Sequence, residues 1–283
     1  MNDNPFISVV IPTYNSEKHI LKTTKVFLKY LRSLPYSFEL IYINDASIDN
    51  TFETLKFIQK ENKEVNSYNV KKNIGQLNCI NLGLKISKGR YVISADDDLQ
   101  YKTSDISLLL DKIQVNGMLV VNGKSNDASE NLIYMMFKSI VFPLFLSVFF
   151  FRYSKKGFFS SLKIFDKKQL DEFKIVNVFH FWEIPLSKIS YCEIVKAKGV
   201  RGGSSYSLSS RIKVFRHILI KFFLEFFKIF TVIFLLLFFF TINFNFFIIS
   251  LFSVVLILFL SFKLKQDKIR YLSIAREEKA ILK

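Results

Sequence analysis

A run of 34 residues without a charged side chain, 229–262, restricts the possible folds of this chain more than any other part of its sequence. As one helix the run would extend about 51 Å, whereas the hydrocarbon core of a bilayer is about 30 Å thick. A start at residue 222 and a break at the polar residues Thr241, Asn243 and Asn245 give two spans, about 222–242 and 246–262. We therefore expect a transmembrane hairpin, with a single tilted helix or a re-entrant loop as the alternative.

Basic residues flank this run on both sides. Residues 211–283 hold 12 basic and 4 acidic side chains, which is half of the formal net charge of +16. Cations beside an apolar run favour an anionic membrane surface over nucleic acid, and positive flanks stay on the cytoplasmic side. The polar start of the chain does not resemble a signal peptide. We expect an integral protein of the inner (cytoplasmic) membrane, with both termini in the cytosol.

The apolar run suggests two parts. Residues 1–210 would form a cytosolic domain, and 211–283 a juxtamembrane helix, the hairpin and a basic cytosolic tail. Within the first part, Lys138 and Pro143 interrupt another apolar stretch, so 132–156 is expected to form interfacial helices, with a buried helix pair as the alternative. Two distant cysteines without a CxxC partner predict neither a disulfide nor a zinc site.

The first 130 residues alternate between short apolar β-branched runs and amphipathic helical patterns. Strands are expected at 6–11, 38–43, 67–70 and 91–95, and helices at 17–31, 51–59, 76–87 and 105–115. Such alternation predicts an α/β domain with a parallel sheet covered on both faces. Its ligand crevice would lie at the carboxyl ends of the strands.

Polar motifs follow three of these expected strands, at 13–16, 44–49 and 96–98. Neither a GxGxxG fingerprint nor a GxxxxGK[ST] loop follows the first strand. Three consecutive carboxylates repel one another unless a cation neutralises them, and the alternate pair Asp96 and Asp98 can reach one ion. Mg²⁺ or Mn²⁺ typically binds one or two carboxylates together with substrate phosphates. We therefore expect a metal site and a diphosphate substrate.

Four segments carry a resemblance to a known family. SVVIPTYNS (8–16), ELIYINDASIDNT (39–51), KKNIGQLNCINLGLKISKGRYVISADDDLQ (71–100) and RGGSSYSL (201–208) resemble, in order, the family 2 glycosyltransferases with the Rossmann-like GT-A fold. DDDLQ, the 201–207 segment and the hairpin resemble the membrane-bound branch of dolichyl-phosphate mannose synthase and bacterial polyprenyl-phosphate glucosyltransferases. Coverage is good over 6–115 and 157–270.

The resemblance assigns roles to particular positions. It implies nucleotide binding by Pro12, Tyr14, Asp45 and Asp96, with Asp49 less certain, metal binding by Asp96, Asp98 and Gln100, and catalytic roles for Asp96, Asp98 and Arg201. Arg201, Ser205 and Tyr206 match a loop over the diphosphate and acceptor phosphate. Asp97 is left out of the ligand set. The chain differs from the family pattern at Ser16, Asn44 and Ser205. The cation missing at Ser205 could come from Arg211 or from the basic residues Arg152, Lys155 and Lys156.

These features predict a metal-dependent transferase that moves a sugar from a nucleotide-diphosphate sugar to a polyprenyl (undecaprenyl-type) phosphate at the membrane, and the resemblance implies that it is inverting. A phosphate monoester has a second pKa of about 6 and attacks without a general base. An alcohol acceptor on a lipid-linked or surface glycan is the first alternative, with Glu183 or Asp166 as the base. An inactive membrane scaffold is the second, and a homo-oligomer is compatible with the sequence.

Overall fold

The computed structural model describes residues 4–125, 161–173, 184–195, 231–232, 251–263 and 265–266. The chain divides into two compact units, Met1–Gly203 with Lys279–Lys283, and Ser204–Glu278. The predicted interfacial segment 132–156 lies outside the described residues, as does most of the predicted hairpin.

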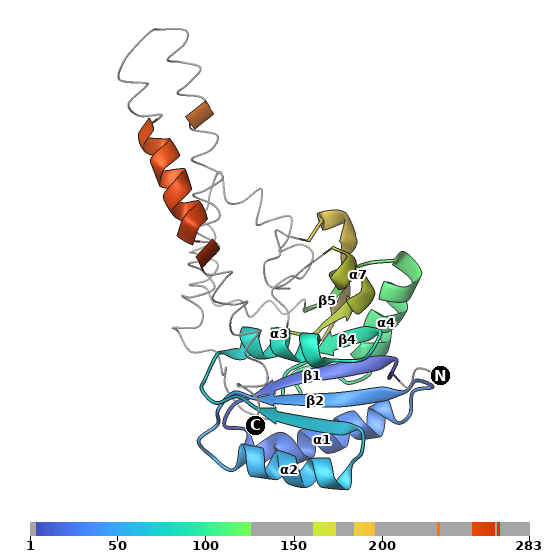
Figure 1. The fold of residues 1–283 in the computed structure, drawn as a ribbon. Helices are drawn as coiled ribbons and strands as arrows, with labels where there is room; N and C mark the ends of the chain where they lie inside the picture. The colour runs from blue at the N-terminus through green and yellow to red at the C-terminus, as the bar shows by residue number, and fades with distance from the viewer. Residues whose placement is uncertain are drawn as a thin grey trace. The chain divides into compact units, whose positions relative to one another are not determined.

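Seven strands of the described part form one sheet in the order β3-β2-β1-β4-β6-β5-β7 (Figure 1). Their bounds are Ile7–Thr13 (β1), Phe38–Asn44 (β2), Val65–Asn69 (β3), Tyr91–Ser94 (β4), Val120–Ser125 (β5), Lys163–Asp166 (β6) and Ile189–Ile194 (β7). The strands β1 to β4 pair in parallel, whereas β6 is antiparallel to both β4 and β5. The last strand, β7, is parallel to β5.

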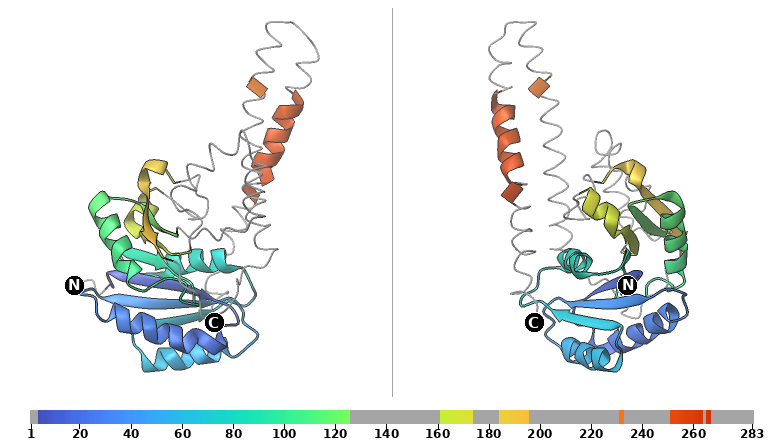
Figure 2. Two further views of the ribbon diagram at one scale, coloured as in Figure 1. Left: turned by 180° about the vertical axis from the view of Figure 1, so that it is seen from behind. Right: turned by 45° about the vertical axis from the view of Figure 1, so that its right-hand side comes forward.

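Helices cover both faces of this sheet. Their bounds are Glu17–Leu31 (α1), Thr51–Glu61 (α2), Gln76–Ile86 (α3), Asp105–Asn116 (α4) and Lys167–Glu172 (α7), with a short 3₁₀ helix at Leu186–Lys188. The helices α1, α2 and α4 bury their apolar sides in one core with β1, β2 and β4. Figure 2 shows α3 on the opposite face from α1 and α2.

Alternation along β1 explains this division. Val9 and Ile11 point into the core that contains α1, whereas Val10 points towards α3. The helix α3 approaches so closely that a Cβ at Gly83 would lie 2.2 Å from Val10 Cγ1. Gly89, just before β4, is equally constrained, because a Cβ there would lie 2.6 Å from the backbone nitrogen of Ser8.

The four predicted strand and helix pairs at the start of the chain are confirmed, with shifts of one or two residues at the ends of several elements. The sequence prediction did not include β5, β6 and β7, which extend the sheet and add its antiparallel part. The sheet is therefore mixed and not purely parallel.

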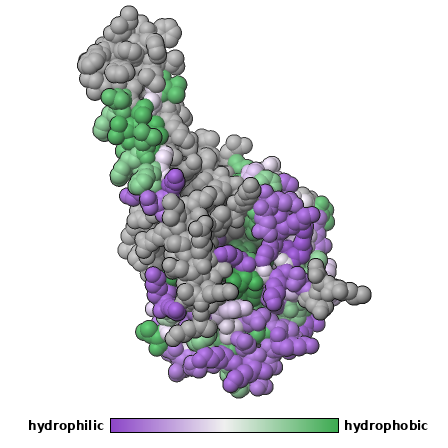
Figure 3. Space-filling model, in the orientation of Figure 1, coloured by the Kyte–Doolittle hydropathy of each residue, from purple (hydrophilic) through white to green (hydrophobic). Residues whose placement is uncertain are grey.

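Residues 251–263 of the second unit are helical. Much of this helix is exposed and apolar, as Figure 3 shows by its green band, and the side chains concerned include Leu251, Phe252, Val255, Leu258, Phe259 and Phe262. Thr231 Oγ1 donates a hydrogen bond to Ser253 Oγ at 2.7 Å. Within the described residues, no helix combines the length and the apolar composition that a crossing of the bilayer requires.

Candidate functional site

The loops after β1 and β2 are joined at the carboxyl edge of the sheet. The backbone N–H of Asn15 donates to Ser47 Oγ at 2.9 Å, and the N–H of Ile48 donates to Asn15 Oδ1 at 3.1 Å. Within the ranges that the structure describes, three non-glycine residues have a positive φ, namely Asn15 (52°), Ala46 (55°) and Leu99 (56°). They lie in the loops after β1, β2 and β4. Backbone strain of this kind gathers at functional sites, so the three loops together mark the candidate site.

Asp45, predicted to bind the nucleotide, connects the loop after β2 to the start of α3. Its Oδ1 accepts a hydrogen bond from the N–H of Ile74 at 2.7 Å, and its Oδ2 accepts one from the N–H of Gly75 at 2.9 Å. Gly75 adopts φ +89°, a conformation that other residues reach only with strain. Burial raises the pKa of the Asp45 carboxyl, and these two backbone donors oppose the rise.

Asp96 is held from two sides. Gln76 Nε2, in the first turn of α3, donates to Asp96 Oδ1 at 2.9 Å, and the Ser161 side chain hydrogen-bonds the same carboxylate. Burial raises the pKa of Asp96 to about 6, and the neighbouring charges of Asp98 and Asp97 add to the rise. The first acid of the motif is therefore close to the third, and neutral donors surround it.

Asp97 faces the other side of the sheet, towards α1. Ser16 Oγ donates to its carboxylate, Thr23 Oγ1 donates to its backbone carbonyl at 2.6 Å, and His19 Nε2 lies 3.7 Å from its Oδ2. The residue is 6% exposed. Asp97 is thus a buried structural acid, which agrees with its exclusion from the ligand set. Ser16, where the family usually has glutamate, supplies one of its donors.

Asp98 is 4% exposed, and Gln100 Nε2 donates to its Oδ2. Its Oδ1 is buried and has no hydrogen-bond partner in the part of the chain that the structure describes. Leu99, with its positive φ, forms the turn between Asp98 and Gln100. A buried carboxylate oxygen without a donor is unfavourable unless a cation neutralises it. The residues present therefore fit a divalent ion.

Over the described ranges, no group of three or more His, Cys, Asp or Glu side chains is placed to hold a metal. A diphosphate-bound Mg²⁺ or Mn²⁺ needs only one or two carboxylates from the protein, because water and phosphate oxygens complete the octahedron. Asp96 and Asp98 meet that smaller requirement.

Comparison with known proteins decides the family. The family model for "Glycosyl transferase family 2" matches residues 8–173, which is more than half of the chain. The chain belongs to glycosyl transferase family 2. The family relationship that the sequence motifs indicated is therefore confirmed.

Several curated relatives of this family 2 chain carry names with a polyprenyl phosphate. Dodecaprenyl-phosphate galacturonate synthase of Rhizobium johnstonii is 22% identical over 229 residues, which cover 78% of this chain and 68% of that protein. Undecaprenyl-phosphate 4-deoxy-4-formamido-L-arabinose transferase of Proteus mirabilis is 32% identical over 105 residues, 37% of this chain and 32% of that protein. The match to an uncharacterised glycosyltransferase of Synechocystis, 32% identical over 38% of this chain, likewise spans only 33% of that relative's length.

Solved structures share the fold. Glucosyl-3-phosphoglycerate synthase from Mycobacterium tuberculosis, in complex with Mn²⁺, UDP and its product, has a TM-score of 0.52 at 18% identity and covers 76% of this chain and 78% of that one. The mannosyltransferase PcManGT from Pyrobaculum calidifontis, in complex with GDP-mannose and Mn²⁺, has a TM-score of 0.52 at 13% identity and covers 80% and 65%. The expected α/β, Rossmann-like GT-A fold is therefore confirmed.

The remaining predicted site residues fall into two groups. Pro12 is buried in β1 opposite Ile43, and Tyr14, just beyond this strand, is 39% exposed. Both lie at the carboxyl edge with Asp45 and Asp96. The other group lies outside the described residues and comprises Arg201, Ser205, Tyr206, Arg211, Arg152, Lys155, Lys156 and Glu183.

Asp166 is not placed to act as a general base, so this alternative from the sequence was wrong. Its Oδ1 accepts from the N–H of Gln169 and caps α7, and its Oδ2 accepts from Arg90 Nη2 at 2.8 Å. Asp166 also pairs with Tyr91 at the amino end of β4, whereas Asp96 follows the carboxyl end. The reason for the error is the antiparallel direction of β6, which the sequence did not reveal.

Two residues at the site were missed by the sequence analysis. Gln76 follows the glycine that starts α3, and Ser161 precedes β6. Because Ser94 pairs with Lys163 in an antiparallel register, Ser161 stands opposite Asp96. The position of Gln76 after a Gly at a helix entry was a usable signal. The position of Ser161 gave no usable signal, because it depends on the pairing of strands that are distant in sequence.

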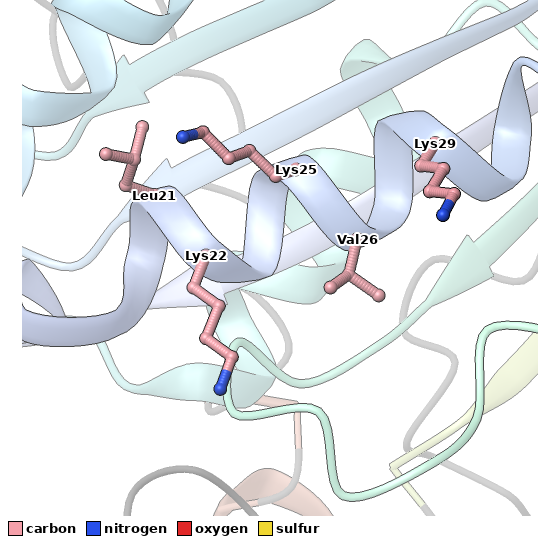
Figure 4. A pocket seen from close by; sticks show the side chains of 5 residues that line it. All are labelled: Leu21, Lys22, Lys25, Val26 and Lys29. Atoms are coloured by element: carbon pink, nitrogen blue, oxygen red, sulfur yellow. The ribbon is translucent and has the colours of Figure 1, made fainter.

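A hollow on the exposed side of α1 is a weaker candidate site. Figure 4 shows the side chains that line it, Leu21, Lys22, Lys25, Val26 and Lys29. It is lined by one helix alone, and no acid is among its lining residues. The strand ends therefore remain the candidate site.

Proposed function

We propose that the protein transfers a sugar from a nucleoside-diphosphate sugar to a polyprenyl phosphate, with inversion at the anomeric carbon. The observation that carries the choice of acceptor is the match to dodecaprenyl-phosphate galacturonate synthase, because it extends over 78% of this chain. Undecaprenyl phosphate in the name of the Proteus relative supports the same class of acceptor. The sugar and the base of the donor are left to experiment.

We propose that Asp96, Asp98 and Gln100 hold Mg²⁺ or Mn²⁺ with the donor. The buried Asp98 oxygen, which has no donor among the described residues, supports this assignment, and so does the Mn²⁺ bound with nucleotides in the two solved structures of the same fold. When bound, such an ion would stabilise the negative charge that develops on the departing diphosphate. Pro12, Tyr14 and Asp45 would orient the nucleotide at the same edge.

The acceptor phosphate would attack the anomeric carbon directly. At neutral pH a phosphate monoester is largely dianionic, so no side chain has to remove a proton. The engagement of Asp166 with Arg90 and α7 removes one candidate base and so supports a phosphate acceptor. Arg201, Ser205, Tyr206 and Arg211 are the residues we propose for binding the acceptor phosphate, with Arg201 the catalytic one.

We further propose that 222–242 and 246–262 anchor the protein in the inner membrane with both termini in the cytosol. The exposed apolar side chains of the helix at 251–263 support a lipid environment. An anchor of this kind would keep the transferase domain at the surface in which the acceptor lipid is dissolved.

The proposal is tested with the full chain in detergent. Radiolabelled UDP-sugars and GDP-sugars are each incubated with Mn²⁺ and either undecaprenyl phosphate or undecaprenol. We expect label to enter the lipid only with undecaprenyl phosphate. Preferential labelling of undecaprenol would favour an alcohol acceptor, whereas no turnover of any donor would favour a scaffold.

A further inference from the structure

The start of α3 contacts both halves of the site. The backbone N–H groups of Ile74 and Gly75 bind the carboxylate of Asp45, and the side chain of the next residue, Gln76, binds Asp96. Gly75 makes this change of direction possible through its φ of +89°. The contact with Asp45 therefore fixes the point from which Gln76 reaches the metal-side acid.

Asp96 needs such a contact because of its neighbours. It is followed directly by two further carboxylates, and the repulsion from Asp97 and Asp98 favours any rotation that moves its charge away. Gln76 from α3 and Ser161 from the approach to β6 donate to it from different elements. Both donors are neutral, so they hold the carboxylate without replacing the cation that it would bind.

These two contacts leave capacity for a metal. A carboxylate has about four acceptor positions, and two donors occupy only part of them. Hydrogen bonds to ligating carboxylates orient them, and their loss typically weakens metal affinity by about 10-fold to 100-fold. Gln76 has the position and the chemistry for this role.

We propose that Gln76, assisted by Ser161, is a positioning residue that holds the Asp96 carboxylate in the orientation in which it binds the divalent ion. This inference rests on the proposed function, because it concerns the metal of the same site. Gln76 itself touches neither the donor sugar nor the acceptor in this account. Its effect is exerted through Asp96 alone.

The test compares Gln76→Met with Gln114→Met in the full chain in detergent. Methionine keeps the length and helix propensity of glutamine but lacks the amide donor, and Gln114 is an exposed glutamine of α4. Binding of Mn²⁺ is followed by the loss of the free-ion signal in electron paramagnetic resonance, without nucleotide or turnover. We expect the affinity of Gln76→Met to fall by about 10-fold or more, and that of Gln114→Met to match the wild type.

Further variants separate the possible failures. Ser161→Ala should also weaken Mn²⁺ binding. Folding of each variant is judged by thermal unfolding without metal, and Ser161→Ala becomes the deciding variant if Gln76→Met does not fold. If Gln76→Met folds and binds Mn²⁺ with wild-type affinity, the positioning role is refuted and the proposed function stands. If only Ser161→Ala folds, wild-type Mn²⁺ affinity in that variant has the same consequence. If the wild type binds no Mn²⁺, or binds it as well after Asp98→Ala, the metal site and the positioning role both fall.

Discussion

Replacement of Asp98 by alanine should separate stability from function. Asp98 is 4% exposed, one of its carboxylate oxygens has no hydrogen-bond partner within the described residues, and the other accepts from Gln100. Removing a buried, poorly satisfied charge relieves a desolvation cost of about 1–3 kcal/mol, which offsets the lost hydrogen bond. We therefore expect the free energy of unfolding without metal to stay level or to rise by up to about 2 kcal/mol.

The response to Mn²⁺ should change in the opposite sense. An ion that binds only the folded state at roughly 100 times its Kd stabilises that state by about 2.7 kcal/mol. For a domain of roughly 150–250 residues this corresponds to a rise in Tm of about 5–11 °C. The wild type should show this rise in a thermal melt with Mn²⁺, whereas Asp98→Ala should show none and should lose sugar transfer.

Asp97→Ala is the matched control. Asp97 is the adjacent acid, but Ser16 donates to its carboxylate and His19 lies nearby, so its loss should lower the free energy of unfolding by about 1–3 kcal/mol. The Mn²⁺ response should remain. The reasoning is refuted if Asp98→Ala keeps the Mn²⁺ shift, or if the Asp97 variant loses it while still folded.

Three further predictions concern the surrounding fold. Asp166→Ala removes the cap of α7 and the partner of Arg90, so urea titration should show a loss of about 1–3 kcal/mol while transfer continues; a folded but inactive variant would restore Asp166 as a base. Burial lowers the pKa of Lys163 from 10.5 to about 7, so between these values the unfolded state binds the extra proton and Tm should rise with pH. Lys163→Met should flatten this rise, and an unchanged slope in thermal melts would contradict the assignment. Gly89→Ala should cost about 1–3 kcal/mol in urea titration, because its Cβ would meet the Ser8 backbone at 2.6 Å; wild-type stability would show that the backbone yields.

The first half of the sheet could be predicted because its signals are local. Each strand from β1 to β4 is a short run ending in turn-forming residues, and each following helix has its own apolar period. The strands β5 to β7 lack such signals. In particular, β6 has only four residues and begins with a buried lysine, Lys163, whose Nζ donates to Asn122 Oδ1 at 3.0 Å. A charged residue within a short strand suggests an exposed position, and only the pairing of distant strands shows that it is buried.

The residues of the candidate site also divide into those that local sequence patterns predicted and those that they did not. Alternation of side chains along the chain predicted that Asp96 and Asp98 can reach one ion. Asp97 was left out of the ligand set, and its contacts with Ser16 and Thr23 agree with a structural role. The donors to Asp96 could not be predicted, because Gln76 and Ser161 meet it from elements that are 20 and 65 positions away along the chain. Local patterns identify which residues carry charge, whereas tertiary contacts decide how that charge is satisfied.

Three consecutive acids at the end of one strand are tolerated because each has a different environment. The Asp97 carboxylate accepts from Ser16, just before α1, and that of Asp96 accepts from neutral donors of α3 and the approach to β6. Asp98 alone among them keeps a buried oxygen without a donor in the described part of the chain. Buried polar atoms without a hydrogen-bond partner are expected where function requires them. The different environments of the three carboxylates are thus the structural argument that the third acid, Asp98, is available to bind a ligand.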